Sequence, residues 1–110
     1  MTQKDFVEQI SRTFAEALKV IEVKNSDYSA ENNPFSNFEI QGWLTGTLPE
    51  QAILGDIARK IARMRELVAT NKEAKVADER VVDTCMDLMN YAAILKVYLE
   101  NKEKSDTVKQ

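Results

Sequence analysis

The sequence predicts an all-α protein, an antiparallel bundle of three long helices with a short helix in an ordered loop. Its 110 residues include only three Gly and two Pro, and apolar residues recur at helical spacing. An apolar fraction of 44% and a charged fraction of 30% are typical of a folded globular chain. We expect one helical domain over residues 1–101 and a flexible charged tail over residues 102–110.

The first two long helices are predicted from their apolar spacing and their end signals. The first covers about residues 3–24, with Asn25 as its stop. The second covers about residues 47–71 and ends near Asn71. Thr47 is a suitable N-cap for this helix, and Glu50 lies three residues later, as in a capping box.

The third long helix is expected to begin after Asp78, which can cap it, and to end near Asn101. Its apolar positions are dense enough to place apolar side chains on more than one side, so we expect this helix to be central. A bundle of only three helices leaves apolar surface uncovered. We therefore expect a homo-oligomer, a dimer or a tetramer.

The segment between the first two helices is rich in turn formers and contains four aromatic residues, Tyr28, Phe35, Phe38 and Trp43. We expect an ordered loop with a short helix around residues 35–43. The later three aromatics could simply fix the loop to the bundle. Alternatively, Tyr28 and Phe35 could stack on a nucleobase, with nearby polar side chains serving its edge and ribose: Asn25, Asp27, Asn33 and Asn37.

Composition excludes several classes of function. The chain has a net charge of −3 and a pI near 5.0, which argues against nucleic acid as a partner. It contains no His, so Ser-His-Asp, Cys-His and HExxH chemistry are excluded. Cys85 is the only cysteine, and neither a membrane span nor a signal peptide is apparent. We expect a cytoplasmic protein with no membrane partner.

The third helix carries an acidic stripe, formed by Glu79, Asp83, Asp87 and Asn90 at positions i, i+4, i+8 and i+11. These residues share one helical face, and like charges four residues apart are destabilising. A divalent cation would offset this cost, since hard cations prefer clustered oxygen ligands. Basic side chains on a facing helix would also offset it, and a solvated face is the third alternative.

The second helix offers the complementary charges, with Asp56, Lys60 and Arg63 at i, i+4 and i+7. Two interpretations stay open for this basic pair: pairing with Asp83 and Asp87, or binding a phosphate. Arg59 and Arg65 are expected to point elsewhere and to be solvated.

Together, these segments resemble a known family. The runs that carry the resemblance are Lys24-Asn25-Ser26-Asp27-Tyr28, Asn33-Pro34-Phe35-Ser36-Asn37-Phe38, 56–67 and 78–92. They resemble small bacteriophage proteins described as nucleotide-modification-associated or MazG-like. The wider group comprises oligomeric all-α nucleoside triphosphate pyrophosphatases that hold Mg²⁺ with acidic residues on two facing helices.

The resemblance implies that Glu79, Asp83 and Asp87 would hold metal if the protein is such an enzyme. The second helix departs from the family pattern, because Asp56 is its only acidic residue in a position where a Glu-x-x-Glu pair is expected. Basic side chains there suit phosphate binding better than metal-assisted hydrolysis. The cofactor is therefore either none or Mg²⁺.

The favoured hypothesis is a phage-type nucleotide-binding protein in the host cytoplasm that captures a small nucleotide without hydrolysing it. It could be an anti-defence sponge for an immune signal such as a cyclic ADP-ribose variant or a cyclic dinucleotide. The alternatives are a Mg²⁺-dependent pyrophosphatase and an accessory protein whose stripes are only ion pairs. The expected ligand-binding residues are Lys24, Asn25, Asp27, Tyr28, Phe35, Asn37, Lys60, Arg63, Asn90 and Tyr91.

Overall fold

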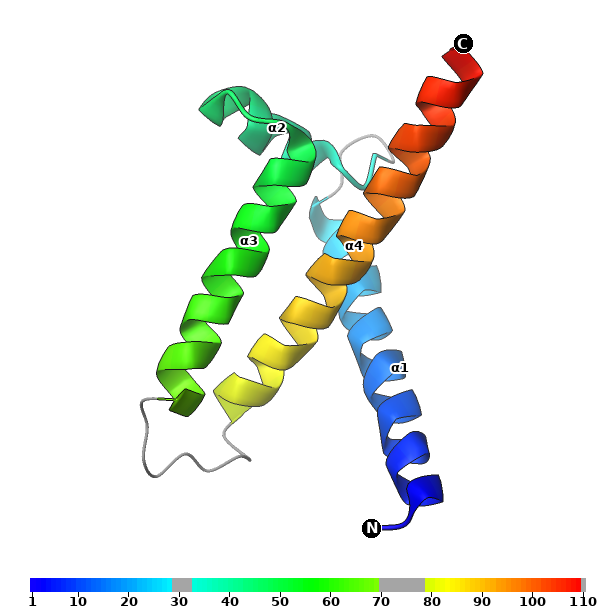
Figure 1. The fold of residues 1–110 in the computed structure, drawn as a ribbon, viewed down its shortest axis with the longest axis vertical. Helices are drawn as coiled ribbons and strands as arrows, with labels where there is room; N and C mark the ends of the chain where they lie inside the picture. Colours follow the sequence, from blue (N-terminus) through cyan, green and yellow to red (C-terminus); the bar gives the residue numbers. More distant parts are fainter. Residues whose placement is uncertain (29–32, 70–78, 110) are drawn as a thin grey trace.

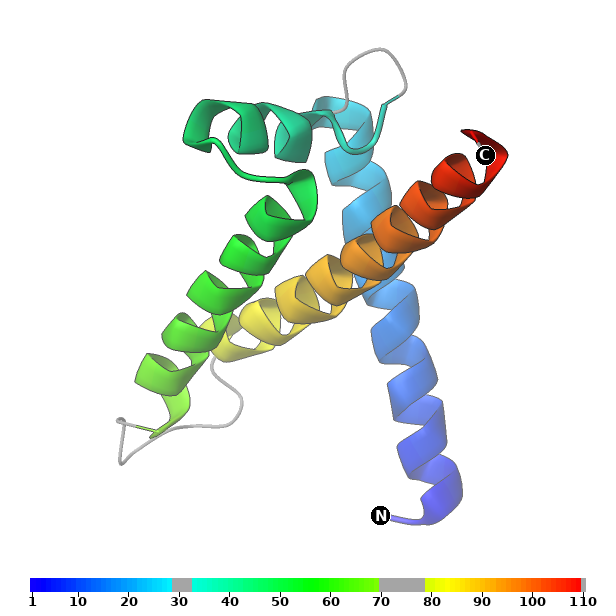
Figure 2. The ribbon, with the colours of Figure 1, turned by 45° about the horizontal axis from the view of Figure 1, so that its top comes forward.

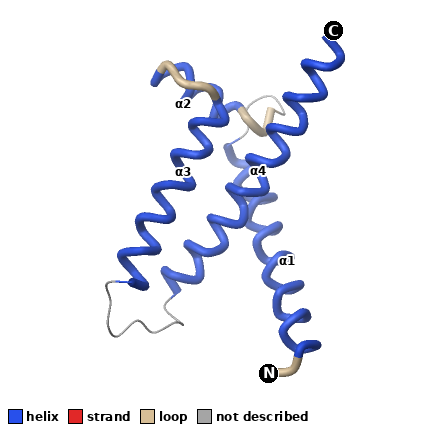
Figure 3. Tube along the Cα trace, in the orientation of Figure 1, coloured by secondary structure: helices blue, strands red, loops and turns tan. Residues whose placement is uncertain are grey.

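In a computed structural model the protein is described at residues 1–28, 33–69 and 79–109, with side chains over 1–24, 33–69 and 80–103. Every regular element over these ranges is helical (Figure 3), which confirms the all-α class. In chain order they are α1 (Gln3–Tyr28), α2 (Ser36–Thr45), α3 (Pro49–Met64), the short π-helix η1 (Arg65–Ala69) and α4 (Glu79–Lys109).

Helix α4 is the centre of the arrangement, as its dense apolar pattern predicted. It lies beside α3 and runs in the opposite direction, while α1 crosses α4 and diverges from α3 (Figures 1 and 2). Helix α2 lies across the start of α3 (Figure 1). The closed three-helix bundle stays a prediction. No helix within the described ranges combines the length and apolar character that a membrane span requires.

The buried apolar core over the described residues is small. Its members are Ala17 of α1, Phe38 of α2 and Ile53 of α3. The Phe38 ring lies edge-on to Tyr91 of α4, with ring centroids 6.5 Å apart. Two of these residues therefore lie beside the middle of α4, Ala17 next to Asn90 and Phe38 next to Tyr91, close to the candidate site.

Two helices are longer than predicted. Helix α1 continues past Asn25 to Tyr28, and α4 continues past Asn101 to Lys109. Asn is a weak helix stop, and no Gly or Pro follows Gly55, so nothing in the sequence of α4 breaks the helix. The expected end at Asn71 and the expected cap at Asp78 lie outside the described residues. The domain over 1–101 with a flexible tail stays a prediction.

The predicted capping of α3 is wrong by one residue. Leu48 is the N-cap, and its backbone N–H donates to Gln51 Oε1 at 2.8 Å. The hydroxyls of Thr47 and Thr45 hydrogen-bond with each other at 2.8 Å instead. A glutamine side chain that reaches back from the third helical position closes the helix start in the same way as a glutamate.

Glu50 serves a different purpose, because its carboxylate joins the start of α3 to the C-terminal half of α4. Lys102 Nζ donates to Glu50 Oε2 at 2.6 Å. This hydrogen bond is the main reason that the pKa of Glu50 lies below its ordinary value, against the opposing effect of burial. The pair is a second attachment of α4 to α3, at the opposite end from the 70–78 connection.

Gly42 and Gly46 allow the sharp corner between α2 and α3. Gly46 has φ of 69°, a left-handed conformation that favours glycine. At Gly42, an added Cβ would lie 2.6 Å from the backbone oxygen of Thr47, whose own N–H donates to Gly42 O at 2.8 Å. The corner closes only because Gly42 has no side chain.

Replacing Gly42 should open this corner. We expect Gly42→Ala to lower the free energy of unfolding by about 1–3 kcal/mol, because the obstructing atom is backbone and cannot rotate away. Urea unfolding followed by circular dichroism measures the change.

Gly55→Ala is the matched control. A Cβ at Gly55 meets only the end of the Arg59 side chain, at 3.8 Å. This change should raise the free energy of unfolding by about 0.5–1 kcal/mol through helix propensity. Equal responses of the two variants would contradict the proposed role of Gly42.

Candidate functional site

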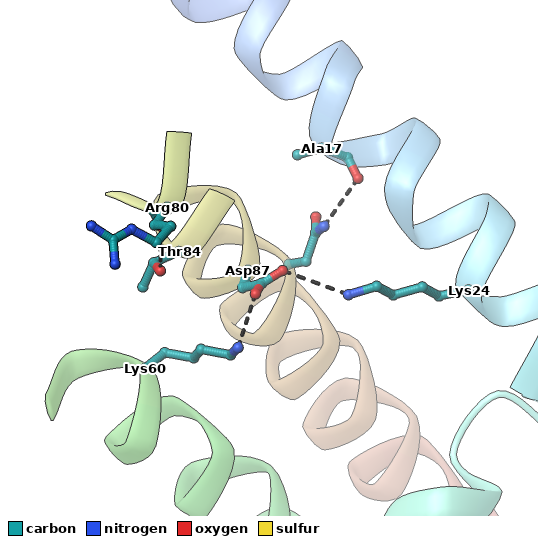
Figure 4. A network of polar contacts seen from close by, with 7 residues as sticks. Ala17, Lys24, Lys60, Arg80, Thr84 and Asp87 are labelled. Atoms are coloured by element: carbon teal, nitrogen blue, oxygen red, sulfur yellow. Dashed lines mark hydrogen bonds and ion pairs between the residues drawn. The ribbon is translucent and has the colours of Figure 1, made fainter. Parts of the chain in front are cut away.

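The carboxylate of Asp87, in the middle of α4, lies between two lysines from different helices. Lys60 Nζ of α3 is 3.0 Å from Asp87 Oδ2, and Lys24 Nζ of α1 is 3.6 Å from Asp87 Oδ1 (Figure 4). The Asp87 side chain is only 21% exposed. Of the two interpretations that the sequence left open, this contact agrees with the pairing of Lys60 with the acidic stripe, at Asp87. Lys24 as a further partner of Asp87 was not predicted.

Beside this cluster, α3 and α4 border an open hollow of about 380 Å³. Its lining residues are Asp56, Arg59, Lys60, Arg63 and Tyr91. Arg59 forms an ion pair with the buried Asp56 one turn earlier. The expectation that Arg59 points elsewhere is therefore wrong: its pairing with Asp56 holds it at the hollow. Arg65 is exposed and is not a lining residue of the hollow.

The hollow and the Asp87 cluster together carry an excess of positive charge, although the whole chain has a net charge of −3. Two carboxylates, Asp56 and Asp87, face four cationic side chains, Lys24, Arg59, Lys60 and Arg63. Arg63 has no ion-pair partner among the described residues. An anion that enters the hollow would therefore meet at least one cationic side chain, Arg63, that forms no ion pair with a described residue.

The residues of the acidic stripe predicted on α4 have different surroundings and different partners. Asp87 is held by lysines, whereas Asp83 is exposed. Asn90 is buried, and its Nδ2 donates to Ala17 O at 3.0 Å, which attaches α1 to α4 (Figure 4). The Glu79 side chain lies outside the described set.

The metal-binding hypothesis for Glu79, Asp83 and Asp87 stays a prediction. Within the described residues, no group of three or more His, Cys, Asp or Glu side chains is close enough to hold a metal ion. Asp87 would have to exchange its contacts with Lys24 and Lys60 for contacts with a cation before it could be a ligand.

The loop aromatics divide into two groups. Phe35 packs edge-on against Tyr98 with ring centroids 5.2 Å apart, and Phe38 packs against Tyr91. These two rings fix α2 to α4, as one of the two interpretations predicted. Trp43 is 81% exposed, so the expectation that it also fixes the loop is wrong. Among the described aromatic residues of this segment, Phe35 and Phe38 contact α4, whereas Trp43 is largely exposed.

The structure therefore brings together four of the predicted ligand-binding residues, Lys24, Lys60, Arg63 and Tyr91. Asn37 is exposed, and the side chains of Asn25, Asp27 and Tyr28 lie outside the described set. The ion pair between Asp56 and Arg59 was not predicted from the sequence. The sequence spacing indicated it, because an acidic residue and an arginine three residues apart on a helix can form an ion pair.

Comparison with protein-family models, with curated proteins and with solved structures gives no match to this chain. The resemblance to MazG-like phage proteins accordingly stays a hypothesis that rests on the quoted residues.

The two lysines around Asp87 should contribute unequally to stability. Lys60 is nearer and less exposed than Lys24, so Lys60→Met should lower the free energy of unfolding by about 1 kcal/mol. Lys24→Met should change it by less than about 0.5 kcal/mol. Both variants keep an apolar stem of similar length, so each serves as a control for the other. A larger loss at Lys24, measured by urea unfolding, would contradict this order.

Proposed function

We propose that the protein binds a small phosphate-bearing ligand, a nucleotide, in the hollow between α3 and α4 and holds it without hydrolysis. One observation carries the proposal: four cationic side chains surround two carboxylates at one place on an acidic chain. A volume of about 380 Å³ lies within the range of small-molecule sites.

The phosphate would bind at the side of the hollow that Lys60 and Arg63 line. A guanidinium group matches two phosphate oxygens at once, and Arg63 has no carboxylate partner among the described side chains. Lys60 adds a point charge, and its ammonium group can contact the ligand and Asp87 at the same time. Both groups are preassembled on one helix, three residues apart.

The base or the ribose would pack against Tyr91. This side chain lines the hollow, and the edge-on contact with Phe38 limits the rotation of its ring. An aromatic ring beside a cationic pocket is a common platform for a nucleobase. Tyr91 is the better candidate for this role than Phe35, since the Phe35 ring already packs against Tyr98.

The resemblance to phage proteins also suggests a biological role for this binding. The protein would act in the host cytoplasm as a sponge for a nucleotide immune signal, such as a cyclic ADP-ribose variant or a cyclic dinucleotide. The same proposal includes a helical bundle that is completed in a dimer or tetramer. Capture without hydrolysis fits a site where Asp87 is paired with lysines.

Calorimetry tests the proposal directly. The full chain is titrated with pyrophosphate, AMP, ATP, ADP-ribose, cyclic ADP-ribose variants and cyclic dinucleotides, first with EDTA and then with Mg²⁺. We expect tight binding of at least one nucleotide in EDTA, because the cationic side chains need no metal. Absence of binding across the panel in both conditions would contradict the proposal.

Matched variants locate the site. Arg63→Ala should weaken binding tenfold or more, since a charge-assisted hydrogen bond contributes about 1.5–3 kcal/mol. Arg65→Ala removes the same charge two residues away, outside the hollow, and should leave the affinity within about twofold. Equal losses would assign the effect to overall charge rather than to the hollow.

Chromatography of the ligand after incubation separates capture from hydrolysis. The nucleotide should be recovered intact in the presence of Mg²⁺. Release of a nucleoside monophosphate and pyrophosphate from a triphosphate would instead support the pyrophosphatase alternative.

A further inference from the structure

The N-terminal half of α1 packs against no other described element. Every residue from Gln3 to Arg12 is exposed, and the first buried residue of the helix is Ala17. Figures 1 and 2 show this half standing clear of α3 and α4. The first part of this 26-residue helix thus extends beyond the region where the helix packs against α4.

The exposed half is nevertheless apolar along one side. Val7, Ile10 and Phe14 are 55%, 41% and 60% exposed, at alternating spacings of three and four residues. The same spacing continues to Ala17, which is buried against α4. One continuous stripe is therefore covered at its C-terminal end and uncovered at its N-terminal end. An alternation of three and four residues is the pattern that packs one helix against another.

The whole chain also exposes more surface than a compact monomer of its size. Its accessible surface is 8635 Å², whereas a compact protein of 12.5 kDa exposes about 6,200 Å². The excess is about 2,400 Å². An obligate homodimer buries about 1,000–2,500 Å² of each partner. This excess belongs to the whole chain and not to α1 alone, and it is as large as the area that a stable dimer buries.

We infer that the exposed apolar stripe of α1 is the interface between two copies of this chain, with the two stripes facing each other across a two-fold axis. A two-fold interface uses the same patch on both partners, so an apolar stripe meets an identical apolar stripe. Residues 4–24 carry four basic and four acidic side chains, so the two copies of the helix do not repel each other through net charge. The inference specifies the interface of the oligomer that the proposed function includes, but the dimer does not require nucleotide binding.

Sedimentation equilibrium of the full chain at micromolar concentration tests the inference. We expect twice the chain mass of 12.5 kDa. The double variant Ile10→Glu/Phe14→Glu should sediment as a monomer, since it places four charges in the interface. Leu44→Glu is the matched control: Leu44 is exposed on α2, at the opposite end of the molecule from the N-terminus, and this variant should remain a dimer (Figure 1).

If the double variant loses helicity, cysteine cross-linking tests the same interface with single substitutions. In a Cys85→Ser background, Val7→Cys, Ile10→Cys and Phe14→Cys are each oxidised and separated on a non-reducing gel. At least one should form a covalent dimer. Arg12→Cys, on the opposite side of the same helix, should not.

Three outcomes would overturn the inference. The parent chain could sediment as a monomer, in which case binding to mixed anionic and neutral phospholipid vesicles would assign the stripe to a membrane surface instead. A dimer that the glutamate substitutions leave intact and folded would place the interface elsewhere. Cross-linking at Arg12→Cys alone would place the opposite side of α1 at the interface.

Discussion

The carboxylate of Asp87 is the point on which the arrangement of the helices depends. Helices α1 and α3 diverge on either side of α4, so α4 has to hold both (Figure 1). Asp87 does so with one lysine from each, and Asn90, one turn later, attaches α1 again through Ala17 O. Because Asp87 is largely shielded from water, losing both lysines would leave an uncompensated charge at this junction.

The same interaction generates the candidate site. Lys60 cannot reach Asp87 without bringing its face of α3 towards α4, and that face also carries Asp56, Arg59 and Arg63. The hollow is thus a consequence of how α3 and α4 are held together. Stability and the proposed ligand binding therefore both depend on Lys60, and an anion in the hollow would compete with Asp87 for this side chain.

The helices were predictable because each depends on apolar spacing within its own segment. The helix ends were less so: the cap of α3 is the backbone of Leu48 with Gln51, one residue from the expected Thr47. In the site, Lys60 and Asp87 were predictable as opposite charges on facing helices. The contact of Lys24 depends on the crossing of α1 over α4, which no local pattern encodes. Trp43 was misjudged because an aromatic residue does not reveal whether another element covers it.

Binding of pyrophosphate to Asp87→Asn, in EDTA, tests the account most directly. The substitution removes the carboxylate that occupies Lys24 and Lys60 but keeps the shape of the side chain. If the hollow is an anion site and Asp87 competes with the anion for Lys60, calorimetry should show tighter binding than in the parent chain. Weaker binding, in a variant that circular dichroism shows to be helical, would contradict the account.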